Sequence, residues 1–179
     1  MRVFVGIAVA DELADAIGRV QAMLPVGRQV PQENLHLTLA FLDDQPEERL
    51  EELHYRLEAI RAAPFELGFA GLGTFGGDLP RVVFADVAPS AALTDLQRRV
   101  VSAARQAGIA PEARRFHPHV TLARLRPGAG VAARIAGFLA DHGGAQLPSC
   151  PVTAFTLYRS DLHPGGARYE ELARYDLLP

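Results

Sequence analysis

The feature that most constrains the fold is a pentapeptide that occurs twice. Segment 36–40 reads HLTLA, and segment 119–123, which starts 83 positions later, reads HVTLA, with four of five residues identical. A single repeat at nearly half of the chain length indicates an internal duplication, because a solenoid needs at least three units. We therefore expect one domain over residues 1–179 with two related lobes, formed by repeats of approximately 1–75 and 80–179.

Hydrophobic periodicity predicts the same order of elements in both halves, namely strand, helix, strand, helix, strand. Strands are expected at 3–9, 35–41, 65–71, 81–87, 116–125, 152–159 and 168–177, and helices at 11–24, 46–60, 90–107 and 131–138. Hydrophobic residues make up 49% of the sequence, which is enough to build one compact core at this length.

Every basic residue is an arginine, and the 18 arginines face 21 acidic residues, for a net charge of −3. The absence of lysine excludes P-loop, Schiff-base and lysyl-adenylate chemistry, which all need a primary amine. A mildly acidic chain argues against sequence-independent binding to long nucleic acids but permits recognition of a terminal phosphate. No stretch approaches the roughly eighteen apolar residues of a membrane span, so we expect a soluble, cytoplasmic protein.

Each pentapeptide places a histidine and a threonine on one side of a strand. Side chains two residues apart in a strand point the same way, so His36 lies beside Thr38, and His119 beside Thr121. If the lobes pack about an approximate two-fold axis, the two pairs converge. One imidazole can then accept a proton while the other donates one, and the hydroxyls can donate hydrogen bonds to phosphoryl oxygens. The pattern predicts a phosphate site with an acid and a base.

Arg124 follows the second motif and could add a cation to this site. In a regular strand, however, positions 119, 121 and 123 share one face, and Arg124 falls on the other. A twist or a strand end must bring the side chain round if it is to hold phosphate.

Two other patterns lead to weaker interpretations. His117 and His119 resemble a metal pair that Asp43 and Asp44 could complete, but the usual third-ligand motifs are absent and the duplicated threonines would have no role. Segment 71–76 reads GLGTFG and matches G-x-G-x-x-G, yet no helix follows it as a dinucleotide fold requires. We expect a glycine-rich connection between strands there, and neither a metal nor a cofactor.

The motif segments 33–39 (ENLHLTL) and 115–124 (RFHPHVTLAR) resemble the two-histidine (2H) phosphoesterases, specifically the bacterial RNA 2′,3′-cyclic phosphodiesterases historically called 2′-5′ RNA ligases. The likeness extends over nearly the whole chain and includes segments 72–76, 80–84, 157–160 and 166–170. It implies an α+β fold that is bilobal and pseudo-two-fold, in which two antiparallel sheets flank a central cleft and the helices lie outside.

The same resemblance implies metal-independent hydrolysis of RNA or nucleotide 2′,3′-cyclic phosphates to 2′-phosphates. By the family's pattern, His119 would be the base that activates water and His36 the acid that protonates the departing 3′ oxygen. The family's phosphate-binding positions match Thr38, Thr121 and Arg124, and Phe41 matches a position beside the first motif. The expected partners are RNA ends or nucleotides that bear a 2′,3′-cyclic phosphate, bound by a monomer that does not associate with membranes.

Two alternatives stay open at the level of sequence. The chain could be a nucleotide-binding or RNA-end-binding module with little turnover, although the presence of both complete motifs argues against this. It could also join a 5′-hydroxyl to a cyclic phosphate, because ligation of this kind reverses the same chemistry and needs no ATP. The family often has an aromatic residue where this chain has Gln29, and Trp where it has Phe84, so its base preference can differ from that of the family.

Overall fold

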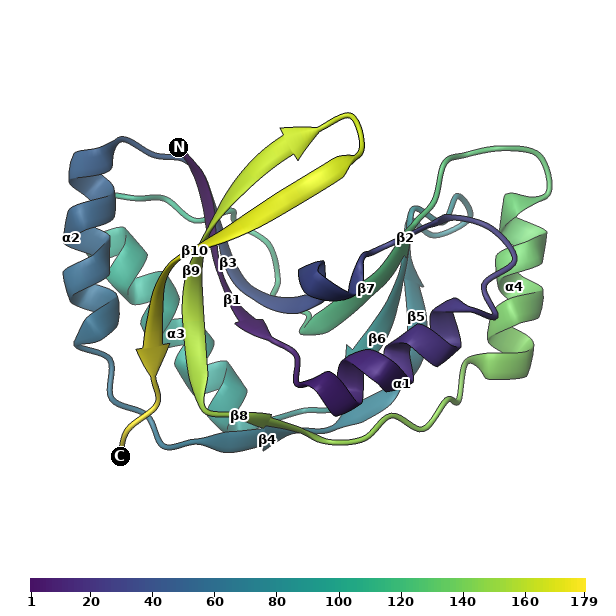
Figure 1. Cartoon of the computed structure of the whole chain (residues 1–179), viewed down its shortest axis with the longest axis horizontal. Coiled ribbons are helices and arrows are strands. Elements are labelled where there is room, and N and C mark those ends of the chain that lie inside the picture. The colour runs from purple at the N-terminus through teal and green to yellow at the C-terminus, as the bar shows by residue number, and fades with distance from the viewer.

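The computed structural model describes residues 1–179 and contains an eight-stranded sheet, a two-stranded ribbon and four α-helices (Figure 1). Every strand pairing is antiparallel. In chain order the elements are β1 (Arg2–Ala8), α1 (Asp11–Gln21), β2 (Arg28–Gln29), a 3-10 turn (Gln32–Asn34), β3 (His36–Asp44), α2 (Glu47–Glu58), β4 (Phe65–Leu67), β5 (Phe69–Phe75), β6 (Val82–Val87), α3 (Ala91–Gln106), β7 (His119–Arg124), α4 (Val131–His142), β8 (Cys150–Val152), β9 (Ala154–His163) and β10 (Gly166–Asp176).

The sheet has the order β10-β9-β1-β3-β7-β6-β5, and β2 also pairs with β7. Its two halves meet between β3 and β7, where one residue pair, Leu37 with Val120, joins them. We call β10, β9, β1 and β3 with helices α2 and α3 the first lobe, and β7, β6, β5 and β2 with helices α1 and α4 the second lobe. Figure 1 shows the two lobes side by side, with α2 at the outer side of the first lobe and α4 at the outer side of the second.

Each lobe takes elements from both halves of the sequence. Helix α1 comes from the first half but contacts β7, and helix α3 comes from the second half but contacts β3 and α2. Strands β9 and β10, at the end of the chain, extend the sheet beyond β1. The boundary between the two sequence repeats is therefore not the boundary between the two lobes.

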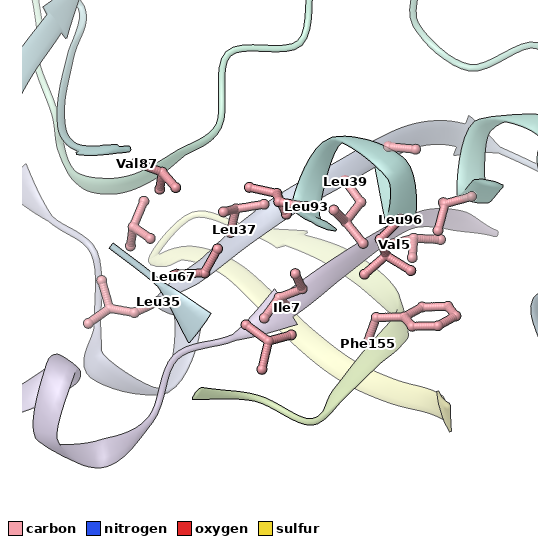
Figure 2. Close-up of a cluster of buried hydrophobic side chains, with 14 of the residues drawn as sticks. Val5, Ile7, Leu35, Leu37, Leu39, Leu67, Val87, Leu93, Leu96 and Phe155 are labelled. Atoms are coloured by element: carbon pink, nitrogen blue, oxygen red, sulfur yellow. The ribbon is translucent and has the colours of Figure 1, made fainter. Parts of the chain in front are cut away.

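The core lies between the sheet and the helices. Figure 2 shows Leu93 and Leu96 of α3 above alternating side chains of β1 and β3, among them Leu37 and Leu39. The matching residues of β7, such as Val120, are also fully buried, and a single cluster of 37 buried residues spans both lobes. Because the core is continuous, the lobes pack as one unit. Because Leu37 and Val120 point into this core, the histidines of β3 and β7 lie on the opposite face of the sheet.

The expected α+β architecture with antiparallel strands is confirmed, with one refinement: the two sheets are halves of one sheet that is continuous through the Leu37–Val120 pair. The expected connection at 71–76 is wrong in part. Residues up to Phe75 belong to edge strand β5, which pairs with β6 through a register shift between Phe69 and Leu72. Glycine lowers strand propensity, but backbone pairing to a neighbouring strand outweighs it here.

No helix is both long and apolar enough to cross a bilayer.

Candidate active site

The Leu37–Val120 pair brings the two motifs together at the centre of the sheet. Continuing this antiparallel register by one residue in each direction sets His36 opposite Thr121 and Thr38 opposite His119. All four side chains are partly exposed, whereas Leu37 and Val120 between them point into the core. We call the face of the sheet that carries these four side chains the histidine face. The expected convergence about an approximate two-fold axis is thus realised through a single strand pair.

Both imidazole rings are held by the same backbone contact. His36 Nδ1 lies 2.7 Å from the carbonyl oxygen of Asn34, and His119 Nδ1 lies 2.7 Å from the carbonyl oxygen of His117. A carbonyl oxygen only accepts hydrogen bonds, so Nδ1 carries the proton in both rings. Each neutral ring therefore presents an unprotonated Nε2, which is the nitrogen that can take or return a proton.

The two Nε2 atoms have different partners. The Thr38 hydroxyl donates a hydrogen bond to His36 Nε2 at 3.0 Å. His119 Nε2 has no hydrogen-bond partner within the protein, since the ring's only such contact is through Nδ1. His119 Nε2 is therefore free to remove a proton from water, whereas His36 Nε2 already accepts a hydrogen bond from a hydroxyl.

Aromatic rings pack around His36. The Phe4 ring lies 4.7 Å from it between centroids, and the Tyr169 ring of β10 meets it edge-on at 5.1 Å. Tyr158 of β9 stacks on Phe4 at 5.0 Å. These rings shield part of the first imidazole from water.

Aromatic rings also pack against His119, which has a charged neighbour as well. The rings of Phe75 and Phe84 meet it edge-on at 4.8 and 5.3 Å. The Phe84 ring lies directly over Gly73, where a Cβ atom would come within 2.7 Å of its tip, so glycine is required there. Beside these rings, Asp86 Oδ1 accepts a hydrogen bond from His117 Nε2 at 2.9 Å.

Burial lowers the pKa of both histidines. The pKa of His36 falls to about 4, chiefly because burial disfavours the charged ring, with smaller lowering contributions from the charges of His119 and Arg124. The pKa of His119 is also lowered, mainly by burial, and Asp86 partly counteracts this shift. Both rings are therefore neutral at pH 7 without substrate. His36 can therefore act as an acid only when an anionic ligand binds beside it and favours the imidazolium.

A β-bulge moves Arg124 onto the histidine face. The register of β7 against β6 skips Leu122, and an unpaired residue of this kind shifts the alternation of all later side chains by one. The Arg124 side chain is exposed, and its positive charge contributes to lowering the pKa of His36 and His119. The regular alternation assumed from the sequence does not hold at this point.

The first motif has a bulge at the matching place. The register of β3 against β1 skips Leu39, so Phe41 points to the histidine face at the position equivalent to Arg124 in the second motif. Phe41 is 46% exposed, and its ring centroid lies 5.9 Å from that of Phe4. One end of the site therefore carries an exposed aromatic ring and the other end a cation.

The histidine pair at 117 and 119 does not point at one centre, because His117 turns to Asp86. Asp44 lies at the end of β3, 3.7 Å from the N-terminal amine. The structure contains no group of three or more His, Cys, Asp or Glu side chains arranged to hold a metal ion.

The sequence patterns indicate no role for several residues that complete the site, namely Phe4, Asn34, Phe75, Asp86 and Tyr169, and they suggest only a metal-binding role for His117, which instead bonds Asp86. Asn34 and His117 could have been found from the repeat, because both precede their histidine by two residues. The three aromatic residues lie on three other strands, β1, β5 and β10, and only the strand order brings them to the motifs. A single sequence contains no signal for that order.

Comparison with known proteins extends these observations to a family. The family model of the 2′-5′ RNA ligase superfamily matches residues 9–164. An RNA 2′,3′-cyclic phosphodiesterase of Geobacillus stearothermophilus is 34% identical over 98% of this chain, which spans 57% of that protein's length. The enzyme of the same name from Aeropyrum pernix is 35% identical over 81% of this chain and 83% of its own length.

Solved structures agree with the sequence comparison. Escherichia coli LigT in its apo form matches with a TM-score of 0.80 and 31% identity, over 99% of this chain and 98% of LigT. LigT complexed with 3′-AMP matches with a TM-score of 0.77 and 31% identity, over 98% and 96% of the two chains. The paired histidine motifs, the match over residues 9–164 and the agreement in fold together show that the chain belongs to the 2′-5′ RNA ligase superfamily.

Proposed function

We propose that this protein is an RNA 2′,3′-cyclic phosphodiesterase, which hydrolyses 2′,3′-cyclic phosphates of RNA ends or nucleotides to 2′-phosphates. The observation that carries the proposal is the pair of imidazoles on one face, each with Nδ1 bound to a carbonyl oxygen and Nε2 left for proton transfer. Relatives that bear this enzyme name are 34% and 35% identical to the chain. LigT complexed with 3′-AMP supports a ligand that has a phosphate on the ribose.

In the proposed reaction, His119 Nε2 removes a proton from water as the water oxygen attacks phosphorus. The bond from phosphorus to O3′ breaks, and protonated His36 gives its proton to O3′, which leaves a 3′-hydroxyl and a 2′-phosphate. His119 is suited to be the base because its Nε2 is unoccupied. Protonated His36 would be a strong acid, because its low pKa makes it release the proton readily.

The other site residues act on the phosphate in this proposal. The hydroxyls of Thr38 and Thr121 donate hydrogen bonds to non-bridging oxygens, and Arg124 neutralises the charge that develops on them. Phe41 provides an apolar surface at the opposite end, where a base can stack. Neither a metal nor a cofactor takes part, because the residues themselves supply an acid, a base and a cation.

The central experiment measures hydrolysis of a nucleoside 2′,3′-cyclic phosphate in the presence of EDTA. His36→Asn and His119→Asn should each lower kcat by about 10³-fold, the range expected for removal of a general acid or base. His142→Asn is the matched control, because this histidine lies at the far end of α4. Circular dichroism establishes that the variants fold. Full activity in either active-site variant would contradict the proposal, and so would complete loss of wild-type activity in EDTA.

Product analysis distinguishes the proposal from its alternatives. The wild-type protein should convert the cyclic substrate to the 2′-phosphate and leave no 3′-phosphate. Tight binding of a nucleotide without turnover would instead indicate an RNA-end-binding module. Because a catalyst accelerates both directions, the proposal also allows ATP-independent 2′-5′ ligation when a 5′-hydroxyl is supplied in excess. We also propose that the protein acts as a monomer, because both motifs lie in one chain, and that it acts on RNA in the cytoplasm.

A further inference from the structure

A second arginine lies beside Arg124. Strand β2 pairs with β7 so that Arg28 is the partner of Arg124, and the next residue, Gln29, is the partner of Ala123. The Gln29 side chain donates a hydrogen bond to the carbonyl oxygen of Gln21 in α1 at 2.7 Å, so it points to the helix side of the sheet. Because side chains alternate along a strand, Arg28 points to the histidine face, where Arg124 also lies.

Arg28 extends from the second lobe to the first. Its Nη2 atom would lie only 2.9 Å from a Cβ atom built on Gly166, at the turn between β9 and β10. In Figure 1 this hairpin, at the yellow end of the colour scale, leans from the first lobe towards β2. Arg28 makes no ion pair and no side-chain hydrogen bond, although several other arginines do. Its charge is thus available to a ligand.

A cavity of about 660 Å³ lies between the hairpin and the segment before β3. We call it the hairpin groove, and its lining consists of Pro31, Glu33, Asn34, His163, Pro164, Gly165, Gly166, Ala167, Arg168 and Tyr169. Two of these residues also contact His36: the Tyr169 ring packs against it, and the Asn34 carbonyl holds its Nδ1. The groove therefore begins at the proposed catalytic acid, and Arg28 reaches it at Gly166.

The dimensions and chemistry of the groove suit a nucleic-acid strand. Its volume falls within the roughly 300–1,000 Å³ of typical ligand sites. Arg168 in its lining makes no ion pair, and Glu33 is the one acidic lining residue, so with Arg28 the local balance is cationic. The chain as a whole carries a net charge of −3, which makes a local excess of unpaired arginine at this place distinctive.

We propose that the hairpin groove binds the RNA strand on the 5′ side of the cyclic end, and that Arg28 binds the phosphodiester next to the terminal nucleotide. The inference rests on the proposed function, which places the cyclic phosphate between His36 and His119. A planar guanidinium binds phosphate oxygens through two parallel hydrogen bonds. A mononucleoside 2′,3′-cyclic phosphate lacks this second phosphate. Arg28 therefore makes the enzyme prefer an RNA end to a free nucleotide.

The test compares three substrates that differ on the 5′ side: a nucleoside 2′,3′-cyclic phosphate, its 5′-phosphorylated form and a dinucleotide that ends in the same cyclic phosphate. Arg28→Gln should lower kcat/KM about five- to tenfold for the two substrates that carry the second phosphate, as loss of a partly exposed charged hydrogen bond predicts. The nucleoside substrate should be hydrolysed at an unchanged rate. Arg134→Gln, on the outer surface of α4, is the matched control and should change none of the three rates.

A purely structural role for Arg28, as a link between the lobes, would lower the rates of all three substrates equally and lower Tm, and this result would overturn the inference. Equal kcat/KM of wild type and Arg28→Gln on the dinucleotide would also overturn it. Binding of a fluorescent dinucleotide 2′-phosphate, compared with that of a nucleoside 2′-phosphate, separates this inference from the catalytic proposal. Arg28→Gln should weaken only the dinucleotide complex, and this can be measured even if the wild-type protein hydrolyses nothing.

Discussion

The two motifs share a backbone but not an environment. In both, Nδ1 of the histidine binds the carbonyl oxygen two residues earlier, and in both a bulge follows the threonine. The side chains at matching positions differ, because Phe41 stands where the second motif has Arg124, and Asn34 stands where it has His117. Aromatic rings pack against both histidines, but the first is bonded to a hydroxyl, whereas the second keeps a free Nε2 and is the strand partner of Asp86.

The different surroundings explain how a duplicated site can carry out an asymmetric reaction. Hydrolysis of a cyclic phosphate needs one group that accepts a proton and one that donates it, and identical environments would give both groups the same pKa. Here the backbone that positions the rings is retained, and the neighbours that set their proton affinity have diverged. The two exposed ends of the site also differ, because Phe41 makes one end apolar and Arg124 makes the other cationic.

The two equivalent positions after the bulges should affect activity to very different extents. Arg124→Gln should lower kcat/KM about 100-fold on every cyclic phosphate, because removal of one donor to a developing oxyanion costs about 2.7 kcal/mol. Phe41→Ala should lower it only a few-fold, and by different factors for purine and pyrimidine substrates. Steady-state kinetics on adenosine and cytidine 2′,3′-cyclic phosphates measures both. Equal losses in the two variants would show that the two ends of the site do not differ as inferred.

A smaller effect concerns stability and the buried first histidine. The pKa of His36 is about 4 in the folded protein and about 6.5 in the unfolded chain, so the unfolded chain binds more protons between these values. The free energy of unfolding should therefore fall as pH decreases from 7 to 4, by about 2–3 kcal/mol from this residue. Urea denaturation at several pH values measures the fall, which should be smaller by that amount in His36→Asn. Parallel curves for the two proteins would refute the assignment.

The smallest effect concerns the charged neighbour of the second histidine. Asp86 raises the pKa of His119, so Asp86→Asn should lower this pKa further. The acidic limb of the profile of kcat/KM against pH should then move to lower pH, by less than about one unit because the pair is exposed to solvent. Glu58→Gln on α2 is the control that removes one negative charge far from the site. A shift to higher pH would contradict the proposed role of Asp86.

Much of the fold followed from periodicity. The four helices lie where the spacing of Leu, Ile and Val predicts them, for example α2 and α3, because an amphipathic helix needs only its own sequence to show which face is buried. Strand positions depend more on neighbouring strands. Segment 71–76 was expected as a connection, and most of it is strand β5, since a glycine-rich segment becomes a strand only when a partner such as β6 lies next to it.

The sequence predicted only the part of the site that depends on local patterns. His36, Thr38, His119 and Thr121 could be identified because their spacing is repeated and a strand places them on one side. Arg124 could not be placed, because the bulge at Leu122 appears only when β7 pairs with β6. Tyr169 could not be connected to His36, because β10 reaches it only through the order of the strands.

The sequence by itself determined the duplication, the two histidine–threonine pairs, and the absence of any lysine to form an adenylylated intermediate. The tertiary structure alone decided that the lobes exchange elements, that one residue pair joins the motifs, and that Arg28 and Arg124 share a face. These features differ in whether they depend on residues near in sequence or on residues far apart in sequence. Alternation and helical periodicity are local, whereas the register, the bulges and the lowered pKa of His36 depend on strands distant in sequence.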